Sequence, residues 1–280
     1  HDLSWAAGDA QAKGFLIGAT SGRTTLNGEG LQHQDGHSHI LSSTIPNCLS
    51  YDPAYAYEVA VIVKDGIKKM YVDQENYFYY ITTINENYSH PEIPNGSEEG
   101  IIKGMYKLIE EENADVRLIG SGAILREAIK AREILKKYNI TAEVWSATSF
   151  NLLRKNGMEV ERKNHLNPDK DSELSYVEQC FSDKDIPVIA ATDYMRSYSE
   201  QIRPYIKSPY HTLGTDGYGR SDSRETLRDF FEVDSTNISR SAIYALYKKN
   251  HFSKEQIIDF YKDLEVDSNK PNPWEVWCQK

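Results

Sequence analysis

The chain has 280 residues, of which 39% are hydrophobic and 26% are charged, and its formal net charge at pH 7 is -10. This balance is typical of a globular protein, and the length fits one large domain or two ordinary ones with ample core. The acidic charge argues against nucleic acid and against an anionic membrane surface as partners. No apolar run approaches the roughly 20 residues that a membrane helix needs.

The cysteines and the first residues of the chain indicate where the protein is located and whether the chain is complete. Cys48, Cys180 and Cys278 lie far apart and form no CxxC pair. They therefore predict neither a disulfide framework nor a thiolate zinc site, and they favour a cytoplasmic location. The chain starts at His1, without methionine and without a signal-peptide core. We expect that an upstream part of the protein precedes it.

The first third of the chain alternates between predicted helices and strands. Apolar spacing predicts a helix over 3–15, and a polar, glycine-rich stretch follows at 18–36. Asp52 and Pro53 predict a helix start, because Asp caps helices and Pro fits the first turn. Apolar residues at helical spacing extend that helix over 53–71. The expected strands cover 45–51 and 77–84, and the second, rich in aromatic and β-branched residues, is typical of a parallel sheet buried on both faces.

Proline, asparagine and acidic residues at 91–96 predict a boundary between two domains, 1–95 and 96–280. Strands and helices alternate again after it, which indicates a mostly parallel sheet with helices on both faces. The expected strands cover 116–122, 142–146, 186–191 and 210–214, and the expected helices cover about 124–138, 222–231, 236–250 and 253–264. Ser221 or Asp222 is expected to cap the helix at 222–231. The predicted fold class is α/β, with two domains built on mostly parallel sheets.

The strongest candidate for chemistry is the stretch from Gly22 to His39. It holds three of the eight histidines, His33, His37 and His39, within seven residues, and Glu29 precedes them between two glycines. Histidine donates or accepts a proton near neutral pH, and glycine lets backbone approach a ligand closely. General acid/base catalysis needs such groups. The alternative is a solvated, histidine-rich loop without chemistry.

Three further interpretations are weaker. The histidine spacing matches no standard zinc motif, so no metal site is predicted. Residues 120–122, Gly-Ser-Gly after a strand, lack the third glycine of a dinucleotide-binding turn, which favours an ordinary strand-to-helix turn. In the glycine-rich stretch 214–224, Arg220 and Arg224 are positioned to hold an anion or an acidic neighbour, and the neighbour is favoured.

Long strings within these regions resemble the family of homodimeric pyruvate dehydrogenase E1 components. They are the runs at 22–33, 35–39, 45–62, 81–88 and 213–225, and together they extend the resemblance over nearly the whole chain. The wider transketolase superfamily shares only the outline, such as an Asp-Gly-x-x-His loop followed by Ile-Pro-Asn. The resemblance implies that residues 1–95 are the C-terminal half of a thiamine-diphosphate pyrimidine-binding domain and residues 96–280 a transketolase C-terminal-like domain.

The same resemblance implies roles for individual residues. His33 would contact the pyruvate-derived adduct, Glu29 would support that site, and His39 would contact substrate. Gln34 departs from the family pattern, where an acid is expected beside His33. The cofactors implied are thiamine diphosphate and Mg²⁺. Their diphosphate and Mg²⁺ site and the activating glutamate would lie upstream of His1, because no Gly-Asp-Gly motif occurs in the chain. The chain alone is therefore expected to be inactive.

The activity implied for the complete protein is decarboxylation of pyruvate, with transfer of the acetyl unit to the lipoyl group of an E2 component. Its implied partners are pyruvate, lipoylated E2 and a second copy in a homodimer. Two alternatives stay open at this point. One is a transketolase or a 2-oxoglutarate dehydrogenase E1. The other is a structural or dimerisation module with no chemistry of its own.

Overall fold

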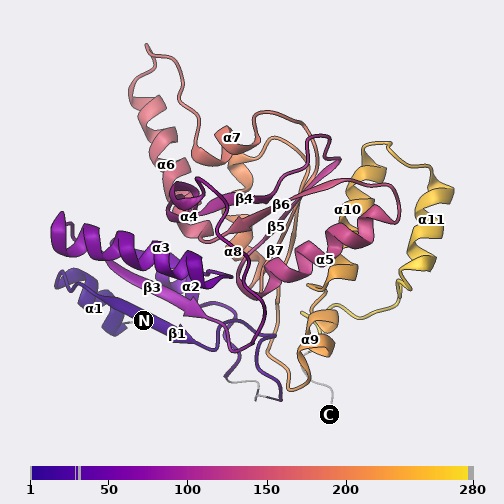
Figure 1. Ribbon diagram of the computed structural model, residues 1–280, viewed down its shortest axis with the longest axis horizontal. Helices are drawn as coiled ribbons and strands as arrows, with labels where there is room; N and C mark the ends of the chain where they lie inside the picture. Colours follow the sequence, from indigo (N-terminus) through magenta and orange to yellow (C-terminus); the bar gives the residue numbers. More distant parts are fainter. Residues whose placement is uncertain (1, 29, 31–32, 277–280) are drawn as a thin grey trace.

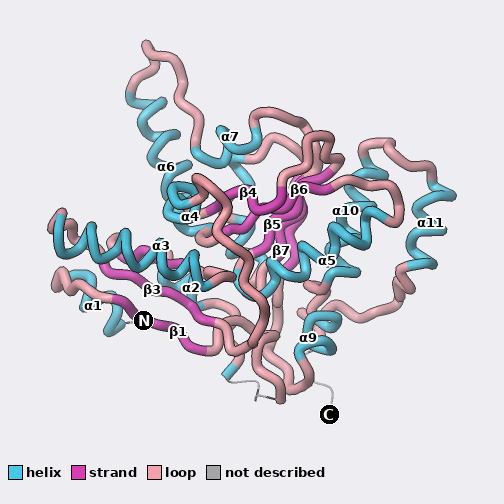
Figure 2. Tube along the Cα trace, viewed as in Figure 1, coloured by secondary structure: helices cyan, strands magenta, loops and turns pink. Residues whose placement is uncertain are grey.

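The computed structural model describes residues 2–28, 30 and 33–276, and this described part contains two β-sheets with helices packed on them (Figure 1). A three-stranded sheet has the order β1-β3-β2 and is parallel throughout. A five-stranded sheet has the order β4-β6-β5-β7-β8, in which β4 alone runs antiparallel to its neighbour. Figure 2 shows the two sheets as separate groups of strands.

The three-stranded sheet is built by the first third of the chain. Its central strand is β3, and α3 packs against one face, where Ile62, Tyr79 and Ile81 are buried together. The elements in chain order are α1 (Asp2–Asp9), β1 (Phe15–Ala19), α2 (Ser38–Ser42), β2 (Cys48–Tyr51), α3 (Ala56–Ile67), a π-helical turn (Lys68–Val72) and β3 (Phe78–Thr83). β3 is buried because it has neighbours on both sides and a helix above it.

The five-stranded sheet is covered on both faces. Helices α5 and α10 bury one face, and α6, α7 and α8 bury the other. The elements in chain order are α4 (Glu98–Lys103), β4 (Met105–Ile109), β5 (Val116–Gly120), a 3-10 turn (Gly122–Ile124), α5 (Leu125–Lys136), β6 (Ala142–Ala147), α6 (Phe150–Leu166), α7 (Tyr176–Phe181), β7 (Val188–Ala191), α8 (Arg196–Glu200), a 3-10 turn (Arg203–Tyr205), β8 (Tyr210–Leu213), α9 (Arg224–Phe230), α10 (Ser235–Lys248) and α11 (Lys254–Asp263).

The α/β class with mostly parallel sheets is confirmed, as are the strands expected at 77–84, 116–122, 142–146, 186–191 and 210–214. The long helix expected at 53–71 corresponds to α3 and the π-helical turn, and the three C-terminal helices are α9, α10 and α11. The division into domains at 95 and 96 stays a prediction. Two sheets assembled from separate stretches of the chain agree with such a division.

Three local predictions were wrong. The helix expected at 3–15 ends at Asp9, and the backbone of Gln11 turns into the left-handed region before β1 joins the sheet. Asp52 does not cap α3, because its carboxylate accepts hydrogen bonds from other elements and the side chain of Glu58 accepts the backbone N–H of Tyr55 at 3.0 Å instead. The cap of α9 is Ser223, one or two residues beyond those expected, and its Oγ accepts the N–H of Thr226.

Candidate functional site

The carboxyl ends of the two sheets face each other, and polar residues follow the strands there. Asp52 follows β2, Ser121 follows β5, and Asp193 lies two residues after β7. Ser121 Oγ donates to Asp52 Oδ2 at 2.9 Å, so the ends of β2 and β5 are directly joined. Ligand sites of parallel α/β sheets form at the carboxyl ends of strands. This junction is therefore the place in the fold where a site is expected.

The histidine-rich loop, residues 20–39, starts at this junction. The N–H of Thr24 donates to Asp193 Oδ2 at 3.2 Å, and the N–H of Arg23 donates to the Asp193 carbonyl at 3.3 Å. Gly22 has φ of +77°, and a Cβ placed there would lie 2.1 Å from Asp193 Oδ2. The sequence folds this way locally because only glycine fits both the backbone angle and the space.

The middle and the far end of the loop are held by the region around α9 and α8. Arg224 donates to the carbonyl of Thr25 at 2.6 Å, and the N–H of Gly28 donates to the carbonyl of Asp222 at 2.9 Å. On the other side, the Gln34 side chain accepts the N–H of Arg220 at 2.7 Å. Figure 1 shows the loop between β1 and α2 running beside α9. Gln34, where the family pattern led us to expect an acid, is thus a buried anchor of the loop.

The predicted site residues lie at different depths of this loop. His33 and His37 are exposed, and the N–H of His33 donates to the carbonyl of Gly30 at 3.0 Å. Asp35 shapes the start of α2, since its Oδ1 accepts the N–H groups of His37 and Ser38, each at 3.0 Å. Glu29 lies outside the described residues, so its predicted support of His33 stays a prediction.

His39 is fully buried and is surrounded by aromatic rings. It stacks on Tyr198 with ring centroids 4.8 Å apart, meets Tyr194 edge-on at 4.7 Å, and its Nε2 lies 3.1 Å from Thr82 Oγ1. Burial lowers the pKa of His39 to about 3, so the ring is neutral at physiological pH. Its role as a substrate contact stays a prediction.

Asp52 is a buried carboxyl group that the sequence interpretation assigned only to a helix cap. Oδ1 accepts the hydroxyl of Thr82 at 2.8 Å, while Oδ2 accepts that of Ser121. Ser121 Oγ also lies 2.9 Å from Thr192 Oγ1. Burial raises the pKa of Asp52 to about 7, although both hydroxyl groups oppose this shift. The nearby carboxylates of Asp193 and Glu58 add to the rise, so the charged form is poorly compensated.

Replacing Asp52 by asparagine is expected to stabilise the chain at alkaline pH. Because the folded pKa is raised from 3.8 to about 7, the folded state binds the proton more tightly, and the free energy of unfolding falls as pH rises through this window. Asparagine carries no charge, and the hydroxyl of Ser121 can accept from its amide. Urea unfolding at pH 8 should show a gain of about 1–3 kcal/mol that vanishes below about pH 4. A variant less stable than the parent at pH 8 would contradict this electrostatic reading.

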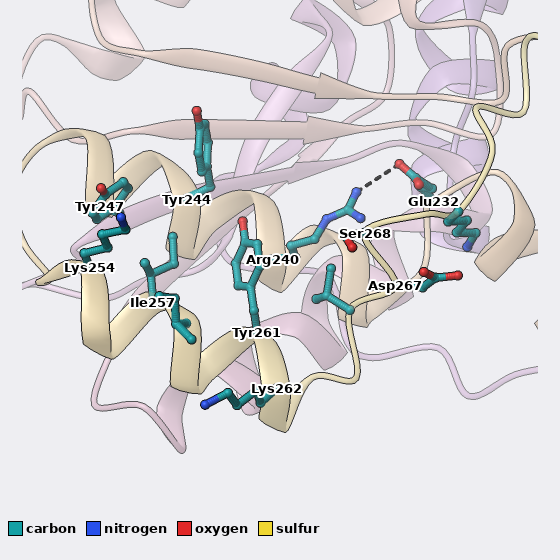
Figure 3. A pocket seen from close by; sticks show the side chains of 13 residues that line it. Glu232, Arg240, Tyr244, Tyr247, Lys254, Ile257, Tyr261, Lys262, Asp267 and Ser268 are labelled. Atoms are coloured by element: carbon teal, nitrogen blue, oxygen red, sulfur yellow. Dashed lines mark hydrogen bonds and ion pairs between the residues drawn. The ribbon is translucent and has the colours of Figure 1, made fainter.

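Two cavities differ in their distance from the histidine-rich loop. A cleft of about 570 Å³ next to the loop anchors is lined by residues that include Met195, Asp216 and Trp274. A larger groove of about 880 Å³ lies between α10, α11 and the segment after α11 (Figure 3). Its lining residues include no part of the loop, and Arg240 is paired there with Glu232 at 2.9 Å. We therefore place the candidate site at the junction and not in the groove.

The described residues hold no cluster of three or more His, Cys, Asp or Glu side chains that could bind a metal ion. His33 and His37 face outward while His39 is buried, so the loop histidines do not converge. Within the same part of the chain, no helix is both long and apolar enough to cross a bilayer. An exposed histidine on this loop is a group capable of proton transfer and hydrogen bonding.

Comparison with known proteins identifies the family. Residues 1–91 match the family described as the pyruvate dehydrogenase E1 component middle domain, and residues 104–234 match the transketolase-like C-terminal domain. Pyruvate dehydrogenase E1 components of Buchnera aphidicola and Escherichia coli K12 are 57% and 54% identical over 277 residues, 97% of this chain. The chain belongs to the pyruvate dehydrogenase E1 family. It spans 31% of the length of each of these relatives.

Solved structures support the fold independently. A transketolase from Pichia stipitis has a TM-score of 0.63 and 18% identity, and the match covers 98% of this chain and 34% of that one. The transketolase of Campylobacter jejuni has the same TM-score at 16% identity, covering 87% of this chain and 33% of its own. At such identities the likeness shows the transketolase-like fold alone. The E1 relatives, three times more identical in sequence, decide the family within that fold.

Proposed function

We propose that the protein carrying this chain is a pyruvate dehydrogenase E1 component. It decarboxylates pyruvate with thiamine diphosphate and Mg²⁺ and transfers the acetyl unit to the lipoyl group of E2, acting as a cytoplasmic homodimer. The observation that carries the proposal is the 57% identity with a named E1 component over nearly the whole chain, the loop with His33 included. The chain spans only part of such proteins, so the activity belongs to the complete protein.

Thiamine diphosphate supplies, when bound, the nucleophilic carbon and the electron sink that decarboxylation needs. The residues described in this chain fit the proton-handling side of that chemistry. The Mg²⁺ and diphosphate side is expected elsewhere, because the Gly-Asp-Gly motif that the resemblance associates with it does not occur in this sequence. The cofactor's anchor is therefore assigned to the part of the protein outside this chain, and the chain by itself is expected to be inactive.

The roles proposed for this chain follow from the position of its loop. His33 is exposed on a loop whose two flanks are hydrogen-bonded to the region around β7 and α9. It would hold or move a proton at the keto oxygen of pyruvate. Because the loop is hydrogen-bonded at both flanks, fewer of its conformations have to be restricted when the substrate binds. Glu29, four residues earlier on the same loop, would orient that imidazole.

The test is an assay of the complete protein with thiamine diphosphate, Mg²⁺, pyruvate and a lipoylated E2 domain. The expected result is acetylation of the lipoyl group, detected by mass, together with release of carbon dioxide. Carbon dioxide without acetylated E2 would contradict the proposed partner. A ketose as the preferred donor would instead favour transketolase chemistry.

A further inference from the structure

Both flanks of the histidine-rich loop are anchored to the second sheet and its following segments, in addition to the contacts that Ser21 and His39 make with β3 of the sheet from which the loop starts. We propose that Asp193 is a positioning residue for the reaction, a proposal that rests on the proposed function. Its carboxylate and its carbonyl fix the entry of the loop, so that His33 is presented in one orientation at the junction. Asp193 itself touches no reacting atom and acts through the loop.

Asp193 holds the start of the loop through both its side chain and its backbone carbonyl. The side chain is buried, and its Oδ2 accepts the N–H of Thr24 at 3.2 Å. The carbonyl of the same residue accepts the N–H of Arg23 at 3.3 Å and the hydroxyl of Thr215 at 2.8 Å. One residue therefore ties two consecutive peptide groups of the loop to the end of β7 and to the segment after β8.

A second contact holds the same point of the loop. Arg228 of α9 donates from Nε to Thr24 Oγ1 at 3.2 Å. Its other nitrogens are held by Glu86 at 2.9 Å and Glu127 at 3.5 Å, so the guanidinium is fixed in place. Thr24 is fully buried between Asp193 and Arg228. A loop residue restrained from two sides has little freedom, so this point of the loop is ordered before substrate binds.

The end of the loop is held by the same segment of the chain as its start. The N–H of Met195, two residues beyond Asp193, donates to the carbonyl of Gly36 at 2.9 Å. A Cβ on Gly36 would lie 2.3 Å from the guanidinium of Arg23, so the two flanks also pack on each other. The short segment from Asp193 to Met195 thus contacts both flanks of the loop and sets their separation.

The experiment compares three variants of the complete protein loaded with thiamine diphosphate and Mg²⁺. Asp193→Ala removes the acceptor for Thr24, while Asp193→Asn keeps one carbonyl acceptor of the same shape. Asp234→Ala is the matched control, because Asp234 accepts the N–H of Asn237 as the cap of α10 and forms no hydrogen bond with the described residues of the loop. The readouts are kcat and KM for pyruvate and hydrogen exchange of peptides covering 21–28 and 34–39.

For Asp193→Ala we expect kcat to fall about tenfold or more with KM changed by less than about threefold, because orientation of a proton-transfer group is lost. Exchange in the loop peptides should rise. Asp193→Asn should restore kcat to within about threefold, and Asp234→Ala should lower the unfolding temperature while leaving kcat and loop exchange unchanged. Unaltered kcat in Asp193→Ala, or equal losses in Asp193→Ala and Asp234→Ala, would overturn the proposal.

A milder variant keeps the test decisive if Asp193→Ala does not fold. Thr24→Val preserves shape, keeps the backbone N–H that Asp193 accepts, and removes the hydroxyl that contacts Arg228 and the Asp193 carboxylate. It should raise exchange at 21–28 and lower kcat by about 3–10-fold. No change in either readout would overturn the proposal. A parent protein that does not turn over pyruvate would contradict the proposed function. An active parent with an unimpaired Asp193→Ala variant contradicts this inference alone.

Discussion

Replacement of His33 by alanine in the complete protein is expected to lower kcat for pyruvate decarboxylation about 100-fold or more, the loss that follows removal of a positioned acid/base group. His33 is exposed on a loop held at both flanks, so its truncation should leave the fold intact. The measurement is steady-state release of carbon dioxide at saturating pyruvate, with thermal unfolding of the variant recorded alongside.

His37→Ala is the control for this experiment. His37 is exposed on the same loop, and its backbone N–H and carbonyl groups take part in the start of α2. Its replacement is expected to change kcat by less than about threefold, as is usual for exposed residues without a role in the reaction. Equal losses in the two variants would assign the effect to the loop and not to His33. A His33→Ala loss of only a few-fold would count against its role.

The second large effect concerns Glu58, and its replacement by alanine is expected to reduce the free energy of unfolding by about 3–5 kcal/mol. The carboxylate accepts the hydroxyls of Tyr106 and Ser146, each at 2.7 Å, and the N–H groups of Ala54 and Tyr55. It thereby joins α3 to β4 and β6 of the other sheet. Alanine would leave the N–H groups of Ala54 and Tyr55 and the hydroxyl of Ser146 without this acceptor, while Tyr106 would keep the Tyr57 hydroxyl as a partner. Urea unfolding of the 280-residue chain, followed by far-ultraviolet circular dichroism, measures the loss.

Glu58→Gln separates hydrogen bonding from charge. Burial raises the pKa of Glu58, so the charged form is costly there, and glutamine removes that cost. Its amide oxygen can accept the two backbone N–H groups, while its NH₂ can donate to the hydroxyls of Tyr106 and Ser146. The variant should therefore stay within about 1 kcal/mol of the parent. A glutamine variant as unstable as the alanine variant would show that the negative charge itself is required.

The elements that could be predicted from sequence are those with a strong apolar period. Strand β3, helix α3 and the helices after residue 222 were predicted because their patterns are set by burial on one or two faces. Strands β1 and β4 were missed, since β1 lies where the predicted helix at 3–15 met the glycine-rich stretch from 18, and β4 is the antiparallel edge of its sheet. Helix α6 is largely polar, and its signal in the sequence was the cap, where Ser149 Oγ accepts the N–H of Leu152 at 3.1 Å.

The loop of the candidate site could be predicted from the sequence, but the buried acidic residues around it could not. Glycines and histidines close together mark the loop at 20–39 in the sequence alone. Asp52, Glu58 and Asp193 gain their properties from burial between the two sheets, and nothing local distinguishes them from exposed acids. Only their position in the sequence could have identified two of them: Asp52 and Asp193 each follow a predicted parallel strand, and ligand sites of such sheets form at the ends of strands.

The resemblance to E1 components assigned the chemistry to the first region of the chain, residues 1–95, and packing and dimerisation to the second region, residues 96–280. The contacts seen here connect the two, since the loop of the first region is held by Asp193, Arg224 and Arg228 of the second. Variants of the second region are therefore expected to alter the reaction without altering any group that meets the substrate. This distinguishes the structure from a simple dimerisation module attached to a separate site.

Substrate choice tests the functional assignment most directly. The measurement is carbon dioxide release by the complete protein, with thiamine diphosphate and Mg²⁺, from pyruvate and from 2-oxoglutarate under identical conditions. We predict turnover of pyruvate with kcat/KM at least about 100-fold above that for 2-oxoglutarate, since pyruvate lacks the second carboxylate and its burial cost. Turnover of 2-oxoglutarate without turnover of pyruvate would contradict the assignment.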